Sequence, residues 1–295
     1  MNRILKNLVY HAPWLFGDRK YLELRWQLKM GCRLDLDNPL SFNEKIQWLK
    51  LYDRKPIYHT MVDKAAAKDY VAGIIGQEHI IPTIGVYDSV GDIPWGSLPS
   101  SFVLKCTHDS GGNIICRDKS SLDICEASRK LRTALKTDFW FRDREWSYKG
   151  VKPRIICEQY MEDPSQKNGL IDYKFFCMNG KPEFLYISEG LENHNTARIS
   201  FADLDGMEMP FKRTDYRNFG GKLPICAHFD EMKLLVAKLA VAVGSPFVRV
   251  DMYEIQGRIY FSELTFYPNG GYIPFEPVEW DCKLGDMIKL RYDRG

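Results

Sequence analysis

The chain has 295 residues, which is enough for one large domain or for two to three lobes. A hydrophobic fraction of 45% and a charged fraction of 27% are typical of a soluble protein, and a net charge of +2 is too small to indicate nucleic-acid binding by itself. The eight cysteines are scattered without a C-x-x-C spacing, which argues against a zinc site and favours reduced thiols in the cytoplasm.

The first 60 residues are predicted to be helical. Residues 1–22 are basic and aromatic, but their apolar stretch is interrupted, so they make a poor signal peptide and are too short to span a bilayer. Two alternatives stay open for this segment: a helix that packs on the rest of the protein, and contact with the inner face of a membrane. Further on, Ser41 and Glu44 form a capping box before an amphipathic helix.

A second helix is predicted to begin near Asp63 and to end at Gly76. A strand signal follows at residues 79–87. Two more strands are predicted at residues 101–108 and 114–118, and they flank a polar turn that contains two glycines.

This turn has features of a phosphate-binding loop. Lys105 is the only charged residue in the apolar strand before it, and a buried ammonium group needs an anionic partner. Backbone N–H groups near Gly111 and Gly112, with the hydroxyl groups of Thr107 and Ser110, could donate to phosphate oxygens. The alternative is a plain Gly-Gly hairpin turn, with the lysine reaching the solvent.

The next segments are predicted from turn residues and periodicity. A helix is expected over residues 121–137, and a polar, aromatic, mobile loop over 142–152. From Arg154 onward the pattern is rich in strands, with a hairpin turn at Asn179-Gly180, before a helix over residues 230–243.

The segment 247–271 reads as a β-hairpin with charged residues on one face. Arg249, Asp251, Glu263 and Thr265 would share that face if the connecting loop had an odd number of residues. Two facing acids repel each other unless a cation joins them, and a divalent ion such as Mg²⁺ prefers oxygen ligands. The alternative is a solvated face with an ordinary ion pair between the arginine and the aspartate.

The order of elements predicts an α+β fold. We expect a helical N-terminal region at residues 1–60, a small lobe with the glycine-rich flap at 61–153, and a large lobe with the metal-binding hairpin at 154–295.

These stretches, in their order, resemble the TupA-like group of ATP-grasp enzymes, which is associated with the synthesis of teichuronopeptide and other surface polysaccharides. The resemblance covers the chain from about Asn38 to Leu290. It is carried by the sequences NPLSFNEKIQWLKLYDRKP, VDKAAAKDYV, FVLKCTHDSGG, IICEQYM, DYKFFCMNGKP, PFVRVDMY and FSELTFYPNGG. It implies the ATP-grasp fold, in which two α+β lobes grip ATP.

The resemblance also implies roles for single residues. Lys64 would be the first lysine that contacts the nucleotide, with Lys68 as a competing candidate. Lys105 would reach the phosphates, and Asp172 would hold the ribose hydroxyl groups or pair with a nearby lysine. The whole set implied to bind ATP is Lys64, Lys105, Thr107, Ser110, Gly111, Gly112, Glu158, Tyr160, Met161 and Asp172.

The hairpin residues take the remaining roles in the resemblance. Arg249, together with Lys105, would be catalytic and would stabilise the transition state, while Asp251 and Glu263 would bind Mg²⁺. Many ATP-grasp members have an Asn two residues after this Glu, whereas this chain has Thr265. Asn269 or water would then complete the metal site, and the number of metal ions stays open.

The implied activity is that of an ATP-dependent carboxylate–amine ligase. It would join an amino acid to a sugar acid or amino sugar of a surface polysaccharide, such as a capsule, in the cytoplasm or at the inner face of the membrane beside the glycan-assembly machinery. Substrate contacts are expected from Arg198 and from the backbone of Gly270 and Gly271, with Glu189 and residues 194–195 as further candidates. The alternatives are a phosphotransferase acting on a hydroxyl group and a non-catalytic partner in glycan assembly.

Overall fold

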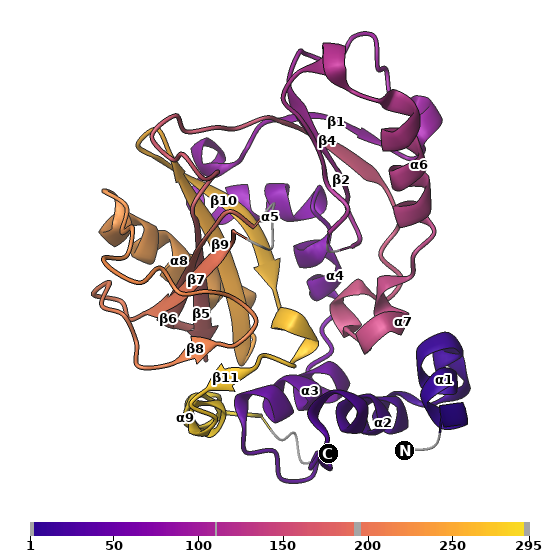
Figure 1. The fold of residues 1–295 in the computed structure, drawn as a ribbon, viewed down its shortest axis with the longest axis vertical. Coiled ribbons are helices and arrows are strands. Elements are labelled where there is room, and N and C mark those ends of the chain that lie inside the picture. The colour runs from indigo at the N-terminus through magenta and orange to yellow at the C-terminus, as the bar shows by residue number, and fades with distance from the viewer. Residues whose placement is uncertain (1–2, 110, 192–195, 292–295) are drawn as a thin grey trace.

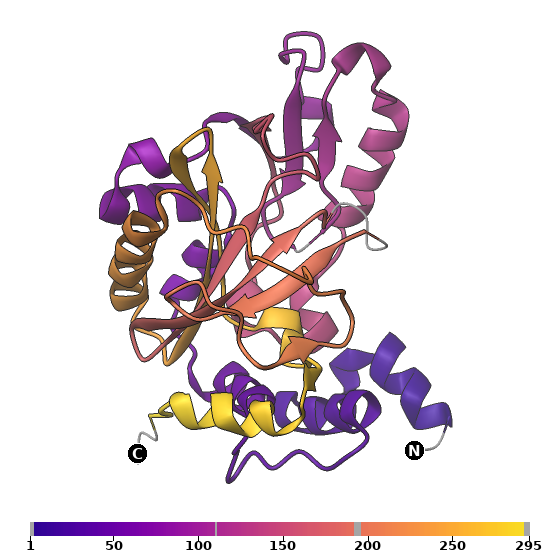
Figure 2. The ribbon, with the colours of Figure 1, turned by 60° about the vertical axis from the view of Figure 1, so that its left-hand side comes forward.

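The computed structural model of the protein describes residues 3–109, 111–191 and 196–291. Ser110 and residues 194–195, which were predicted to contact nucleotide or substrate, lie outside the described residues. Two separate sheets lie beside a base of helices that comes from both ends of the chain (Figures 1 and 2). This mixture of helices and antiparallel sheets confirms the predicted α+β class.

Helices dominate the N-terminal part, as predicted. The predicted capping box is present, because the Ser41 hydroxyl accepts from the Glu44 N–H at 3.2 Å and the Glu44 carboxylate accepts from the Ser41 N–H at 3.0 Å. The Asp63 carboxylate likewise accepts from the N–H groups of Ala65 and Ala66, both at 2.9 Å, at the start of the next helix. The helices of this part are α1 (Arg3–His11), α2 (Asp18–Met30), α3 (Phe42–Tyr52), α4 (Ile57–Val62) and α5 (Ala66–Ile75).

The smaller sheet is antiparallel, with the strand order β1-β4-β2-β3. Helix α6 (Ile124–Leu135) covers one face and shares a core with the strands, while the other face carries Lys105 and Glu158. The predicted boundary between the small and the large lobe, at residue 154, falls just before β4 and so assigns this strand to the large lobe. The structure places β4 in the smaller sheet instead. The strands are β1 (Thr83–Tyr87), β2 (Phe102–Cys106), β3 (Ile114–Cys116) and β4 (Ile155–Gln159).

Residues 142–152 lie between the smaller sheet and the N-terminal helices, and part of this segment is buried. The Arg144 side chain is 1% exposed, donates to the carbonyl oxygen of Pro13 at 2.7 Å and pairs with Asp18 at 3.1 Å. The sequence did not indicate this burial, which is possible because the charge of the arginine is matched inside the protein. The mobility expected for this segment stays a prediction. The short helix α7 (Phe139–Asp143) precedes it.

The larger sheet has the order β10-β9-β5-β6-β7, and all of its pairs are antiparallel. The predicted Asn179-Gly180 turn joins β5 to β6, and both residues have positive φ angles of 53° and 84°. The strands are β5 (Asp172–Met178), β6 (Lys181–Glu189), β7 (Arg198–Ala202), β9 (Phe247–Ile255) and β10 (Arg258–Thr265).

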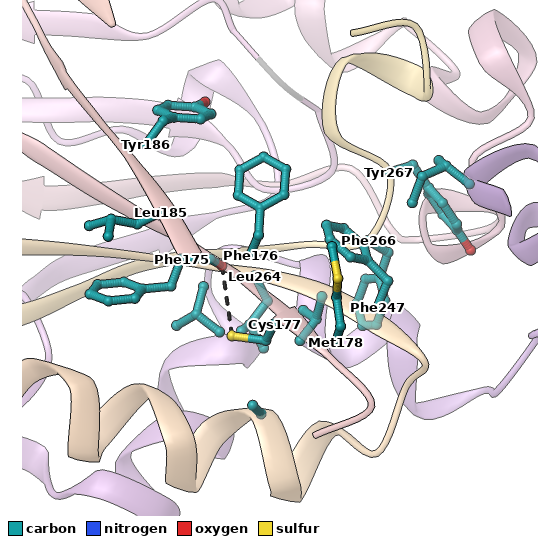
Figure 3. Close-up of a cluster of buried hydrophobic side chains, with 14 of the residues drawn as sticks. Phe175, Phe176, Cys177, Met178, Leu185, Tyr186, Phe247, Leu264, Phe266 and Tyr267 are labelled. Atoms are coloured by element: carbon teal, nitrogen blue, oxygen red, sulfur yellow. Dashed lines mark hydrogen bonds between the residues drawn. The ribbon is translucent and has the colours of Figure 1, made fainter. Parts of the chain in front are cut away.

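Alternation along these strands separates an apolar face from a face that carries the charges. Helix α8 (Phe229–Val243) covers the first face, where Phe175 stacks on Phe229 with ring centroids 5.9 Å apart. Phe176 and Tyr186 point to the opposite side, as Figure 3 shows. Near this side lie the short strands β8 (Lys212–Arg213) and β11 (Phe275–Glu276), and helix α9 (Glu279–Met287) follows.

Single turns of 3₁₀ helix connect many of these elements. They are η1 (Pro13–Leu15), η2 (Gln77–His79), η3 (Val90–Asp92), η4 (Lys119–Ser121), η5 (Trp146–Tyr148) and η6 (Pro268–Gly270). Within the described ranges, none of the helices has the length and apolar character needed to cross a lipid bilayer.

Candidate functional site

The register of the β9–β10 hairpin depends on a β-bulge and not on the length of its turn. Its turn has two residues, Gln256 and Gly257, and not an odd number. With regular pairing, an even turn would place Ser262 opposite Asp251 and would turn Glu263 to the other face. A β-bulge just before Glu263 adds one residue to β10 and corrects this offset.

The result is the shared face that the sequence predicted. Glu263 lies opposite Asp251, and Thr265 lies opposite Arg249. The arginine binds both oxygens of Asp251 through Nε and Nη2, each at 2.6 Å. Its Nη2 also lies 3.1 Å from an oxygen of Glu263 and 3.1 Å from the hydroxyl oxygen of Thr265.

A second cation, from β5, completes this cluster. Lys174 donates to Asp251 at 2.7 Å and to Asp172 at 3.1 Å. Asp251 is fully buried, which by itself would raise the pKa of its carboxyl group, but Arg249 and Lys174 outweigh burial and lower that pKa. The carboxylate is therefore held ionised between two cations, and the predicted ion pair with the arginine is part of a larger buried network.

The two facing acids have the donor chemistry of a magnesium site. Carboxylate oxygens suit this hard ion, and the Glu263 side chain is 37% exposed, whereas both oxygens of Asp251 already bind cations. Within the described ranges no group of three or more acidic, histidine or cysteine side chains could hold a metal ion. Magnesium often takes one or two carboxylates and completes its shell with water and phosphate oxygens. The partly exposed Glu263 fits that use as it stands, whereas Asp251 fits it once one of its oxygens is released from Arg249 or Lys174.

Two lysines meet one glutamate on the inner face of the smaller sheet. Lys105 on β2 lies 2.7 Å from one oxygen of Glu158 on the adjacent β4, and Lys68 on α5 pairs with the other oxygen. Burial would raise the pKa of Glu158, but the two ammonium groups outweigh burial and lower it. Glu158 is thus the anionic partner that a lysine in an apolar strand requires.

Lys64, which precedes helix α5 in the sequence, packs against the start of the glycine-rich turn. Its ammonium group donates to the carbonyl oxygen of Asp109 and lies 3.8 Å from an oxygen of the Asp109 carboxylate. In this turn the Thr107 hydroxyl is buried and, among the described residues, has no hydrogen-bonding partner. Gly111 and Gly112 have φ angles of 106° and 69°, a conformation that favours glycine.

Lys64 also connects the two sheets electrostatically. Burial is the largest influence on this side chain and lowers its pKa, the carboxylates of Glu263 and Asp109 act in the opposite direction, and the ammonium of Lys105 lowers it further. Lys64 therefore lies within electrostatic range of Lys105 on the smaller sheet and of Glu263 on the larger one. The predicted cationic and acidic sites are thus close enough to act on the same ammonium group.

The segment after β4 links the sheets. Tyr160 and Met161 are half-buried there, and the hydroxyl oxygen of Tyr160 accepts from Arg117 at 3.1 Å. Asp172 opens β5 in the larger sheet, where it is buried and bound to Lys174. The proposed contacts of Tyr160, Met161 and Asp172 with a nucleotide stay predictions.

The turn after β10 differs from its predicted use. The N–H groups of Gly270 and Gly271 donate to the carbonyl oxygens of Tyr267 and Pro268 at 2.8 and 3.0 Å. Both donors are used inside the turn, so the structure does not support the prediction that they bind a substrate carboxylate. Asn269 is exposed in the same turn and, among the described residues, has no side-chain hydrogen bond to either acid of the hairpin.

Arg198 is exposed on β7, away from the two acids. It lies 3.8 Å from Glu189 and donates to the carbonyl oxygen of Phe219 at 3.4 Å. Its backbone bridges to Arg217, a residue that the sequence did not single out. Its predicted contact with substrate stays a prediction.

Sequence reasoning missed other buried charges near the site. Lys50 on α3 is fully buried and donates to the carbonyl oxygens of Asp143 and Gly270 at 2.8 and 2.7 Å. Burial lowers the pKa of Lys50 to about 8 and raises the pKa of Glu145 to about 8. No local pattern singles out Lys50, whereas period-two spacing with Asp172 could have placed Lys174 on the charged face.

Comparisons with known proteins place these features in context. A family model described as "TupA-like ATPgrasp" matches residues 44–289, whereas no curated protein matches the chain. Similar solved structures include a D-alanine–D-alanine ligase from Bacillus anthracis complexed with ATP (15% identity, 70% of this chain and 54% of that chain covered, TM-score 0.39). An L-amino acid ligase from Bacillus licheniformis is 12% identical, with 88% of this chain and 57% of that chain covered and a TM-score of 0.44.

Proposed function

The chain belongs to the TupA-like ATP-grasp family, and from this premise we propose that it is an ATP-dependent ligase that joins a carboxylate to an amine. The observation that carries the proposal is that Glu263 on the larger sheet and Lys105 on the smaller sheet both act electrostatically on Lys64, which is bound to Asp109 of the glycine-rich turn. An enzyme that transfers a phosphoryl group from ATP needs cations for the phosphates and acids for the metal ion in one place.

Activation of the acid is the first step. An oxygen of the substrate carboxylate attacks the γ-phosphorus of ATP. The bond between that phosphorus and the bridging oxygen of the β-phosphate breaks, ADP departs, and an acyl phosphate remains. The ammonium groups of Lys64 and Lys105 would hold the phosphates, while Glu158 keeps Lys105 and Lys68 in place. Magnesium held by Asp251 and Glu263 would neutralise charge on the phosphates.

Amide formation is the second step. The amine nitrogen attacks the carbonyl carbon, the carbon–oxygen bond to phosphate breaks, and the nitrogen loses a proton. Arg249 would stabilise the negative charge that develops on the carbonyl oxygen, since its guanidinium is already aligned by Asp251 and Glu263. The turn at Gly111 and Gly112 would exclude water, which otherwise hydrolyses the acyl phosphate.

We further propose that the partners are an amino acid and a sugar acid or amino sugar of a surface-polysaccharide precursor. This rests on the resemblance to the TupA-like group. The solved ligases named above act on amino acids according to their names, which is compatible with an amino acid as one of the two partners.

The test is a product analysis with purified protein, ATP, Mg²⁺, and mixtures of amino acids and uronic acids. A ligase releases ADP and inorganic phosphate only when both an acid and an amine are present, and mass spectrometry detects the loss of one water from the joined product. A stable phosphate ester without free phosphate would instead establish a phosphotransferase. No nucleotide consumption by the wild-type protein over the whole panel would refute both activities.

A further inference from the structure

A cavity of about 440 Å³ lies beside the larger sheet, at strands β8 and β11 and the segment that follows β8. Its volume is within the range of small-molecule binding sites. The residues that line it include Lys212, Arg213, Tyr216, Arg217, Asn218 and Glu276. None of these residues takes part in the proposed phosphoryl transfer.

Cations outnumber acids in this cavity. Lys212, Arg213 and Arg217 line it together with one carboxylate, that of Glu276, which lies 2.9 Å from the ammonium of Lys212. Arg217 is exposed and its charge faces no carboxylate in the ion pairs of the described residues. Lys212 is paired with Glu276 and Arg213 with Asp215, so the charge of Arg217 is the one left in excess, and it favours an anionic ligand. Tyrosine and asparagine add groups that bind hydroxyl oxygens.

Arg213 is a fixed part of this site. Its side chain is 5% exposed, and Asp215 holds Nε and Nη2 at 2.8 and 2.5 Å. Among the described residues Nη1 has no hydrogen-bonding partner, so one donor of a pre-oriented guanidinium group is left for a ligand.

The same arginine lies close to the proposed catalytic centre. The guanidinium carbons of Arg213 and Arg249 are 5.9 and 5.6 Å from the centroid of one ring, that of Tyr186. Arg249 also donates to the Tyr186 hydroxyl at 3.3 Å. Arg213 in the wall of the cavity and Arg249 in the hairpin therefore lie near the same tyrosine ring, which places the cavity beside the proposed catalytic centre.

We propose that this cavity binds the acid substrate, and that this substrate carries a second anionic group besides the carboxylate that is activated. Arg213, Arg217 and Lys212 would hold the second group, a side-chain carboxylate or a sugar phosphate, and the reacting carboxylate would lie toward Arg249. The inference rests on the proposed ligase function, because only that function requires an acid next to Arg249.

Binding without ATP tests the inference separately from catalysis. Calorimetry would compare L-glutamate with L-glutamine, and glucuronic acid 1-phosphate with glucuronic acid. In at least one of these pairs, the member with two anionic groups should bind at least about tenfold more tightly than the member with one, since the second group adds charge-assisted hydrogen bonds. The pair that shows the difference identifies the source of the second anion.

Substitutions then locate the site. Arg217→Gln and Lys212→Gln are exposed changes that should each weaken binding of that ligand about tenfold, with unchanged ATP affinity and an unchanged unfolding midpoint. Arg132→Gln, on the exposed side of α6, is the matched control and should leave binding unchanged. In a turnover assay Arg217→Gln should raise the KM for the acid and not the KM for ATP.

Two results would overturn the inference. One is equal binding of the members of both pairs; the other is an effect of Arg217→Gln no larger than that of Arg132→Gln. Either result, with ligase turnover present, leaves the proposed function intact. Absence of turnover with intact, cavity-dependent binding would count against the ligase reaction instead.

Discussion

The two acids of the hairpin differ sharply at the level of the single residue. Asp251 is fully buried and bound by two cations, whereas the Glu263 side chain is 37% exposed and contacts Arg249 with one oxygen. Removing the charge of a buried acid leaves its partners uncompensated, which is far more costly than the same change at an exposed acid. Substitutions at these two positions should therefore distinguish an effect on folding stability from an effect on catalysis.

We expect Asp251→Asn to lower the free energy of unfolding by about 3–5 kcal/mol, because Arg249 and Lys174 would keep buried positive charges without a counterion. Glu263→Gln should lower it by less than about 1 kcal/mol and should still abolish ATP-dependent turnover. Urea denaturation followed by circular dichroism measures the first quantity. A wild-type midpoint for Asp251→Asn would contradict the buried network.

Residue spacing predicted the charged face but not the means by which it forms. Alternation placed Arg249 and Asp251 on one face of their strand. To bring Glu263 and Thr265 to the same face, the prediction required a connecting loop with an odd number of residues. The structure has a two-residue turn and a bulge before Glu263 instead. A bulge leaves no clear local pattern, because it is stabilised by pairing and packing across strands.

At the level of elements, helix α3 supports the site from outside both sheets. Lys50 donates from this helix to Gln47 on the same helix and to the carbonyl oxygens of Asp143 and Gly270. It thereby connects α7 to the turn that follows β10, the strand that carries Glu263. A buried ammonium group in this position fixes the turn relative to the helix.

We expect Lys50→Met to lower the free energy of unfolding by about 2 kcal/mol and turnover by about tenfold or more. The Asp143 carbonyl loses the donor from Lys50, and the Gly270 carbonyl keeps only the donor from Gln47, so the turn after β10 is held less firmly. Lys45→Met is the control on the same helix. It removes hydrogen bonds to the carbonyl oxygens of Gly285 and Ile288, away from the hairpin, and should leave turnover unchanged. Equal losses of turnover in both variants would argue against a specific support of the site.

Local sequence signals predicted the positions of helices, strands and turns better than they predicted which of these elements pack together. The capping box at Ser41 and the turn at Asn179-Gly180 depend on neighbouring residues, and both are present. The strand β4 was expected at its position, but alternation does not tell which sheet a strand joins. The inward packing of Arg144 depends on Pro13 and Asp18, more than 120 positions earlier in the chain, so no local pattern could indicate it.

At the scale of the whole molecule, the last helix, α9, meets a helix from the N-terminal part of the sequence. Helix α9 packs against α3, and Figure 2 shows them side by side beneath the sheets. The contact is tight because Gly285 approaches the backbone at the start of α3. A Cβ atom at this position would lie 2.1 Å from the carbonyl oxygen of Leu40 and 2.7 Å from the carbonyl carbon of Ser41.

We therefore expect Gly285→Ala to lower the free energy of unfolding by about 1–3 kcal/mol, since a methyl group against backbone atoms forces α9 away from the capping box of α3. Gly73→Ala is the matched control, because this helical glycine of α5 has no atom within 4 Å of the added carbon. It should stabilise the protein by about 0.5–1 kcal/mol through helix propensity alone. Urea denaturation of both variants measures these effects. A neutral or stabilising effect of Gly285→Ala would mean that α9 and the start of α3 are not held in close contact in solution.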